Sequence, residues 1–213
     1  MFVRFLLFCL LCHKLTKSGY ITTSTDGINW TTPNQIGGTS AWSGITYGSS
    51  KFVVVGSKGY ITTSTDGLNW STPKQIGMDS WGGITYGNGR FVVFSNTTSY
   101  ITISTDVVNW STPKQVGSTY WRGITYGDGK FVMVGNSGYI TSSADGVNWS
   151  TPKQVGTTYW NAVNYNNGVF ITVGNEGYMA TSTDGITWTT PEQIKDESGK
   201  VVTATLNGIC AMP

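Results

Sequence analysis

Five aspartates stand in the same local sequence along the chain, and carboxylates are the first candidates for chemistry. They are Asp26, Asp66, Asp106, Asp145 and Asp184. Carboxylates can act in general acid or base catalysis and can bind cations. Each of these, however, follows a serine two positions earlier and precedes turn-forming residues, so it can accept hydrogen bonds from its own turn. A catalytic carboxylate would not be needed five times at equivalent positions, and we therefore predict structural Asp turns.

A second set of residues could bind a ligand. Tryptophans recur at Trp42, Trp81, Trp121 and Trp160, and Tyr120 and Tyr159 precede two of them. The residues that follow differ, with Arg122 and Asn161 in the last two copies. Flat aromatic faces can stack on sugar rings while such polar neighbours bond hydroxyls, and repetition of weak sites gives avidity. The alternative is that the four tryptophans fill the space between repeats.

These residues lie on a repeat that covers most of the chain. Another tryptophan series, Trp30, Trp70, Trp110, Trp149 and Trp188, advances by 40, 40, 39 and 39 residues, which is the length of one propeller blade. Within a repeat we expect strands at 81–86, 90–94 and 100–104, and a fourth from Trp110 to the following Thr-Pro. Such units bury their faces by radial stacking. The sequence predicts an all-β fold, a five-bladed β-propeller of four-stranded repeats of ~40 residues.

The fifth blade must be assembled from both ends of the chain. Residues 201–206 and 209–212 resemble a degenerate first strand, hairpin turn and second strand, which would complete the blade begun by residues 20–35. Residues 19–213 then form one domain, with the last blade closed by the N- and C-terminal segments. One turn departs from the pattern, because Val107 stands where the other copies have glycine. Valine disfavours positive φ, so we expect a distorted turn there.

Residues 1–18 do not match the repeat and have two interpretations. A short apolar run behind Arg4 is typical of a signal peptide, and it is too short to span a bilayer. Alternatively, residues 2–11 form a strand that latches the ring. If this segment lies beside Cys210, a disulfide from Cys9 or Cys12 could lock the closure; otherwise the three thiols stay unpaired. Two cysteines and the single His13 lack the number and spacing of a metal site, and no cofactor is predicted.

The segment Ser64-Thr65-Asp66-Gly67-Leu68-Asn69-Trp70 resembles the Asp-box, or bacterial neuraminidase repeat, although its turn is one residue shorter. The longer repeat is similar to those of secreted bacterial propellers and of phage tail or receptor-binding proteins. The resemblance implies a propeller and a location outside the cell or on a virion. A sialidase would also need three converging arginines, and only Arg4, Arg90 and Arg122 are present, at unrelated positions. A sialidase-like glycosidase is therefore disfavoured, and no nucleophile–base pair supports another hydrolase.

The composition narrows the remaining functions. Charged residues make up 11% of the chain and the net charge is +2, without a basic stripe, which argues against nucleic-acid binding. We expect a non-catalytic, multivalent module that binds carbohydrate. The alternative is a structural or protein-binding propeller, with virion or cell-surface proteins as partners, which would show exposed aromatic or apolar patches on one face.

Overall fold

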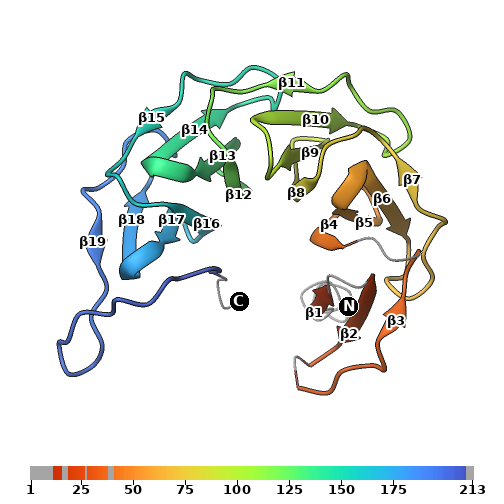
Figure 1. The fold of residues 1–213 in the computed structure, drawn as a ribbon, viewed down its shortest axis with the longest axis horizontal. Helices are drawn as coiled ribbons and strands as arrows, with labels where there is room; N and C mark the ends of the chain where they lie inside the picture. Colours follow the sequence, from red (N-terminus) through yellow and green to blue (C-terminus); the bar gives the residue numbers. More distant parts are fainter. Residues whose placement is uncertain (1–11, 16–18, 27, 38–40, 210–213) are drawn as a thin grey trace, which may run out of the picture.

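The computed structural model describes residues 12–15, 19–26, 28–37 and 41–209. It contains five antiparallel sheets arranged around a common axis, a five-bladed β-propeller, as Figure 1 shows. Four sheets have four strands each. They are β4(Trp42–Gly48) to β7(Lys74–Gln75), β8(Trp81–Gly87) to β11(Lys114–Gln115), β12(Trp121–Gly127) to β15(Lys153–Gln154), and β16(Trp160–Asn166) to β19(Glu192–Gln193). The predicted fold class and blade number are confirmed.

The inner three strands of each blade follow the sequence expectation. The second strands are β5(Lys51–Gly56), β9(Arg90–Ser95), β13(Lys130–Gly135) and β17(Val169–Gly174), and the third are β6(Tyr60–Ser64), β10(Tyr100–Ser104), β14(Tyr139–Ser143) and β18(Tyr178–Ser182). The first strands β4, β8, β12 and β16 contact one another around the axis. Gly44 makes this approach possible, because a Cβ there would lie 2.8 Å from the Cα of Gly83 in the next blade.

The fourth strand differs from the prediction. It was expected between the tryptophan and the Thr-Pro, but the observed outer strands have two residues each and follow the proline. In the second blade Thr102 Oγ1 donates to the carbonyl oxygen of Ser111, and Ser111 Oγ accepts from the N–H of Ile103. These side-chain bonds replace part of the strand ladder, and Pro113 has no N–H to extend it.

The N-terminal blade precedes these four-stranded blades, which we number first to fourth in chain order from β4–β7 to β16–β19. Strand β1(Cys12–Leu15) pairs antiparallel with β2(Tyr20–Ser24), which pairs with β3(Asn34–Gln35). Leu15 lies opposite Ile21, just as Val55 lies opposite Ile61 in the next blade, so β1 occupies a second-strand position. The alternatives for residues 1–18 otherwise concern residues 1–11, which lie outside the described part. Cys9 and Cys210 also lie outside it, so unpaired thiols and a disulfide from Cys9 or Cys12 to Cys210 both stay predictions.

The C-terminal segment does not form the predicted strand over residues 201–206. Only Val201 is paired, in a bridge to Lys195. The N–H of Leu206 donates to the carbonyl oxygen of Gly174, and Asn164 Nδ2 donates to the carbonyl oxygen of Ile209, so the chain runs along the last blade toward the axis. The predicted strand at 209–212 falls almost wholly outside the described residues. Residues 201–205 therefore serve as a linker, like those that enter the other blades.

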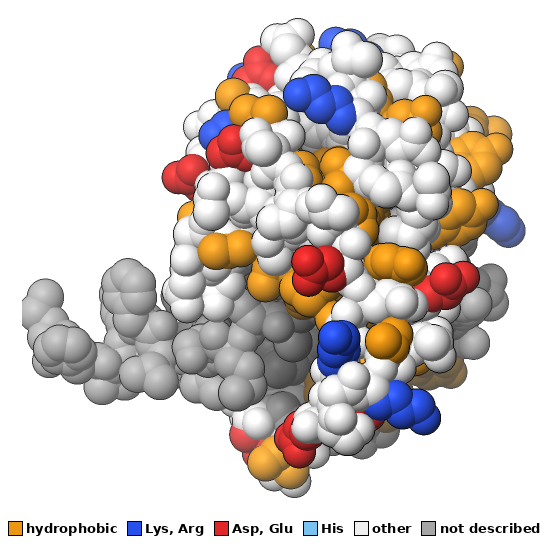
Figure 2. All heavy atoms as spheres, turned by 90° about the vertical axis from the view of Figure 1, so that its left-hand side faces the viewer, with side chains coloured by type: hydrophobic (Ala, Val, Ile, Leu, Met, Phe, Trp, Pro, Cys, Tyr) orange, Lys and Arg blue, Asp and Glu red, His pale blue; other side chains and the backbone are white. Residues whose placement is uncertain are grey.

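The hydrophobic core lies between consecutive blades. One cluster joins Val53 and Val55 of one blade to Trp81, Phe91 and Val93 of the next. On the side shown in Figure 2, single charged side chains are scattered among hydrophobic side chains and uncharged surface. No helix in the described part of the chain is long and apolar enough to cross a membrane.

Candidate binding site

The ring has two faces with different residues. One face carries the starts of the first strands, where Trp42 pairs with Gly56, together with the 3-10 turns η1(Ser57–Gly59), η2(Asn136–Gly138) and η3(Asn175–Gly177). We call it the tryptophan face. The opposite ends of the same strands carry the two-residue hairpins and the five Asp turns, and we call this the Asp-turn face. All of the predicted ligand-binding residues lie at the tryptophan face.

The four tryptophans of this face are buried. Their side chains are at most 3% exposed and pack in the clusters between blades. The indole Nε1 of Trp42, Trp121 and Trp160 donates to the carbonyl oxygen of Ile36, Val116 and Val155 respectively. The corresponding Nε1 of Trp81 is buried without a partner. An indole buried in this way offers no open face to a sugar ring, so the geometry matches the space-filling alternative.

Three of the remaining candidates, Arg122, Tyr159 and Asn161, lie together between the third and fourth blades. Tyr120 and Tyr159 are 52% and 40% exposed, and the Arg122 guanidinium lies over the Tyr159 ring, 5.2 Å from its centroid. Arg122 Nε also donates to Asn136 Oδ1. Arg122 and Asn161 line a hollow of about 230 Å³ at the ring axis. Arg122, Tyr159 and Asn161 therefore form a continuous part of the tryptophan face, and Tyr120 is exposed at the start of β12.

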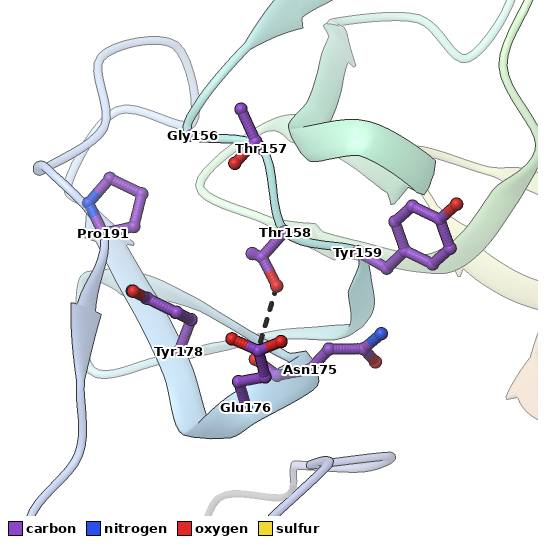
Figure 3. Close-up of a pocket in the computed structure, with 8 residues that line it drawn as sticks. All are labelled: Gly156, Thr157, Thr158, Tyr159, Asn175, Glu176, Tyr178 and Pro191. Atoms are coloured by element: carbon purple, nitrogen blue, oxygen red, sulfur yellow. Dashed lines mark hydrogen bonds between the residues drawn. The ribbon is translucent and has the colours of Figure 1, made fainter. Parts of the chain in front are cut away.

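A larger cavity of about 470 Å³ lies beside them, lined by Gly156, Thr157, Thr158, Tyr159, Asn175, Glu176, Tyr178 and Pro191. Figure 3 shows the Glu176 carboxylate between Tyr178 and Asn175, below Thr158. Thr158 Oγ1 donates to the carbonyl oxygen of Asn175 at 3.3 Å, which ties the two walls together. Glu176 was not among the site residues predicted from the sequence. It could have been found from the change of charge at its repeat position, because Lys58 and Ser137 occupy the equivalent positions of η1 and η2.

Each Asp-turn carboxylate accepts several hydrogen bonds from its own turn. In the first four-stranded blade Asp66 Oδ1 accepts from Ser64 Oγ and from the N–H groups of Leu68 and Asn69, and Oδ2 accepts from Asn69 Nδ2. The same bonds recur at Asp26, Asp106 and Asp145. The backbone N–H of the asparagine is the main cause that holds the pKa of these carboxyls well below the usual range. Each carboxylate is thus committed to its own turn.

The fifth turn has threonine in place of asparagine. Asp184 accepts from the N–H groups of Thr187 and Ile186 and from Ser182 Oγ. These bonds, the one from the Thr187 N–H first, lower the pKa of Asp184 to about 2.

The predicted distortion of the third turn is wrong. Val107 has φ +62°, close to the +74° of Gly67, and its N–H still donates to Ser104 Oγ at 2.9 Å. The Asp106 bonds are also intact. The side chain of Val107 is buried against the core of the preceding blade, so packing holds valine in a conformation that it rarely adopts.

The described residues hold no group of three or more His, Cys, Asp or Glu that could bind a metal ion. Arg90 Nη1 donates to the carbonyl oxygen of Asp145 at 2.7 Å, at the Asp-turn face, whereas Arg122 lies at the tryptophan face. These two arginines therefore do not converge, and Arg4 lies outside the described residues. Among the described residues, the tryptophan face offers aromatic rings, amides and hydroxyls, the Arg122 guanidinium, the Lys58 ammonium, and the carboxylates of Glu176 and Asp79.

Comparison with solved structures places the chain among β-propellers. It superposes on "YCF48 bound to D1 peptide" with a TM-score of 0.63 and 17% identity, covering 86% of this chain and 63% of that one. The structure of the Neurospora crassa Pan2 WD40 domain gives 0.62 and 10%, over 78% of this chain and 56% of that one. The streptogramin B lyase structure gives 0.68 and 16%, over 87% and 69%. The chain thus spans less than two thirds of the first two proteins.

No protein-family model matches the sequence. No curated protein matches it either. The similarities show the propeller fold and do not confirm the neuraminidase-repeat family.

Proposed function

We propose that this propeller is a non-catalytic binding module that engages a protein partner through its tryptophan face. The observation that carries the proposal is the exposed Tyr159 ring beside the Arg122 guanidinium, which is held by Asn136 and Tyr159, with Tyr120 as a further exposed ring at the start of β12. Exposed tyrosine and arginine are the residue types most enriched at protein interfaces.

Two further observations support a protein partner. Met78, on a linker of the same face, is 87% exposed. The propeller described as YCF48 was solved bound to a peptide, and it shares this fold at low identity. A location outside the cell or on a virion remains part of the proposal, on the resemblance of the repeat alone.

The experiment is a screen of the purified full-length chain against a peptide array. The hits are then titrated against Tyr120→Ala and Tyr159→Ala variants. We expect each variant to weaken binding at least about fivefold, since truncating an aromatic anchor costs about 1 kcal/mol or more. Leu68→Ser is the matched control, because Leu68 is 56% exposed on the opposite face. Binding that falls with Leu68→Ser and not with the tyrosine variants would overturn the choice of face.

A second candidate is the carbohydrate binding predicted from the sequence, now at a different place. The cavity beside Tyr159 is lined by an aromatic ring, hydroxyls, an amide and a carboxylate, which are the groups that recognise sugar hydroxyls and C–H faces. A glycan array screened in parallel tests it. Hits that are lost in Tyr159→Ala and kept in Trp81→Phe would favour this candidate over a protein partner.

A further inference from the structure

The cavity at the fourth blade is lined by an exposed carboxylate, that of Glu176, which the fold itself does not use. Gln193 Nε2 donates to the backbone carbonyl oxygen of Glu176 at 2.8 Å, and the residue has φ +56°. Thus the backbone of Glu176 is fixed. Its carboxylate makes no hydrogen bond or ion pair with any other described residue.

The equivalent turns show that glutamate is not required for the structure. Lys58 and Ser137 have φ +56° and +54°, and their carbonyl oxygens accept from Gln75 Nε2 and Gln154 Nε2 in the same way. Three different side chains therefore stand on one backbone conformation. Since the turn forms equally well with each of them, the negative charge at Glu176 is free to serve recognition.

The walls around this charge are aromatic and polar. Tyr178 and Pro191 lie on one side of the carboxylate, and Asn175 and Tyr159 lie on the other (Figure 3). Arg122 already lies over one face of Tyr159, so a second cation would contact Tyr178 and Glu176. A carboxylate beside an aromatic ring is the arrangement that attracts an ammonium or guanidinium group, through charge and through the ring quadrupole.

We propose that this cavity binds a cationic side chain, lysine or arginine, of the protein partner. The inference rests on the proposed function and adds the chemical class of the residue that is recognised. The volume of about 470 Å³ accommodates one such side chain with its neighbouring backbone. Glu176 supplies the counter-charge, and Tyr178 supplies the ring face.

The chain offers its own matched variants for a test. Glu176→Ser gives the fourth-blade turn the serine that the third-blade turn has at this position. Ser137→Glu gives the third-blade turn a carboxylate on the same turn as Tyr139 and near the start of β12, where Tyr120 lies. Both residues already occur at this φ, so neither change should strain the turn. The probes are three acetylated, amidated six-residue peptides of alternating glycine with lysine, arginine or glutamine, titrated at low salt and followed by two-dimensional amide NMR.

We expect the lysine and arginine peptides to shift the amide signals of residues 175–178, and the glutamine peptide to leave them in place. Glu176→Ser should weaken the binding of the cationic peptides about three- to tenfold, the combined effect of an exposed charge pair and a cation–ring contact. Ser137→Glu should create a second set of shifts at residues 136–139. A variant with a damaged fold could not gain this second binding site.

Equal binding of the glutamine and lysine peptides, or unchanged binding in Glu176→Ser, would overturn the inference. Neither result would overturn the proposed function, which depends on Tyr120 and Tyr159 and is tested by their own variants. Glucosamine serves as the last probe. Shifts at residues 175–178 with glucosamine and none with the lysine peptide would assign the cavity to an amino sugar and would also overturn the inference.

Discussion

Val107 is held in the left-handed region by its packing, and replacing it with glycine should therefore destabilise the protein. The residue is 6% exposed and belongs to the cluster that contains Val53, Trp81 and Phe91. Removing a buried valine side chain costs about 1.5 to 3 kcal/mol. Relief of the left-handed strain returns about 1 to 2 kcal/mol, and the greater freedom of glycine in the unfolded chain costs about 0.5 to 1 kcal/mol. The sum is a loss of about 1.5 kcal/mol.

Urea unfolding followed by circular dichroism measures this loss, provided that the slope with denaturant is unchanged. In thermal unfolding the expected decrease in Tm is about 3 to 6 °C for a chain of this size. A rise in Tm for Val107→Gly would refute the reasoning, because it would mean that the strain outweighs the packing.

The reverse substitution in the next blade is the control. Gly146 has φ +73°, and a Cβ there would lie 2.9 Å from Val92 Cγ2 and 3.2 Å from Phe131 Cε2. Gly146→Val would therefore add strain without room for the side chain, and we expect it to cost at least as much as Val107→Gly. If Gly146→Val were tolerated, the special fit of Val107 between its blades would be disproved.

Three other predictions follow from the same geometry. The pKa of each Asp-turn carboxyl is lowered in the folded protein from the usual 3.8. These carboxylates therefore stabilise the fold above about pH 4, and this stabilisation should be lost as the pH falls through their folded pKa values. Acid unfolding that begins only when other groups titrate, together with the usual pKa for Asp184 in an NMR titration, would contradict this prediction. Thr187→Asn should restore the amide donor of the other turns and move the pKa of Asp184 below its value of about 2, which a carboxyl NMR titration measures, with Thr189→Asn as a control outside the turn. Trp81→Phe should lower the free energy of unfolding by about 0.5 to 1.5 kcal/mol less than Trp121→Phe does, because of these two indole N–H groups only that of Trp121 has a hydrogen-bond partner. Equal losses of free energy in urea unfolding would show that this hydrogen bond contributes nothing.

The strands could be predicted closely where their causes are local. In the second blade the expected strands at 81–86, 90–94 and 100–104 are observed at Trp81–Gly87, Arg90–Ser95 and Tyr100–Ser104. Alternation of side chains and two-residue turns act over a few residues, so the sequence displays them directly. The outer strand was misplaced because hydrogen bonds from Thr102 and Ser111 compete with the ladder, and such competition does not appear in the pattern of apolar residues.

The tryptophans show why the binding site was harder to predict than the fold. An aromatic residue at the start of an inner strand has the same spacing in the sequence whether it faces solvent or the neighbouring blade. The spacing follows from the repeat length, whereas burial depends on how two blades pack against each other. Tyr120 and Tyr159 each stand one residue before such a tryptophan, just outside the strand and its packing against the neighbouring blade. Tyr120 and Tyr159 therefore remain accessible while Trp121 and Trp160 do not.

Repetition can nevertheless indicate function when the copies are compared instead of averaged. The turn that contains Lys58, Ser137 and Glu176 keeps its backbone angle and its glutamine partner in three blades while its charge changes from positive to neutral to negative. The turn therefore forms with a lysine, a serine or a glutamate, so the backbone conformation does not fix the charge at this position. The negative charge of Glu176 is thus available for the recognition that we propose.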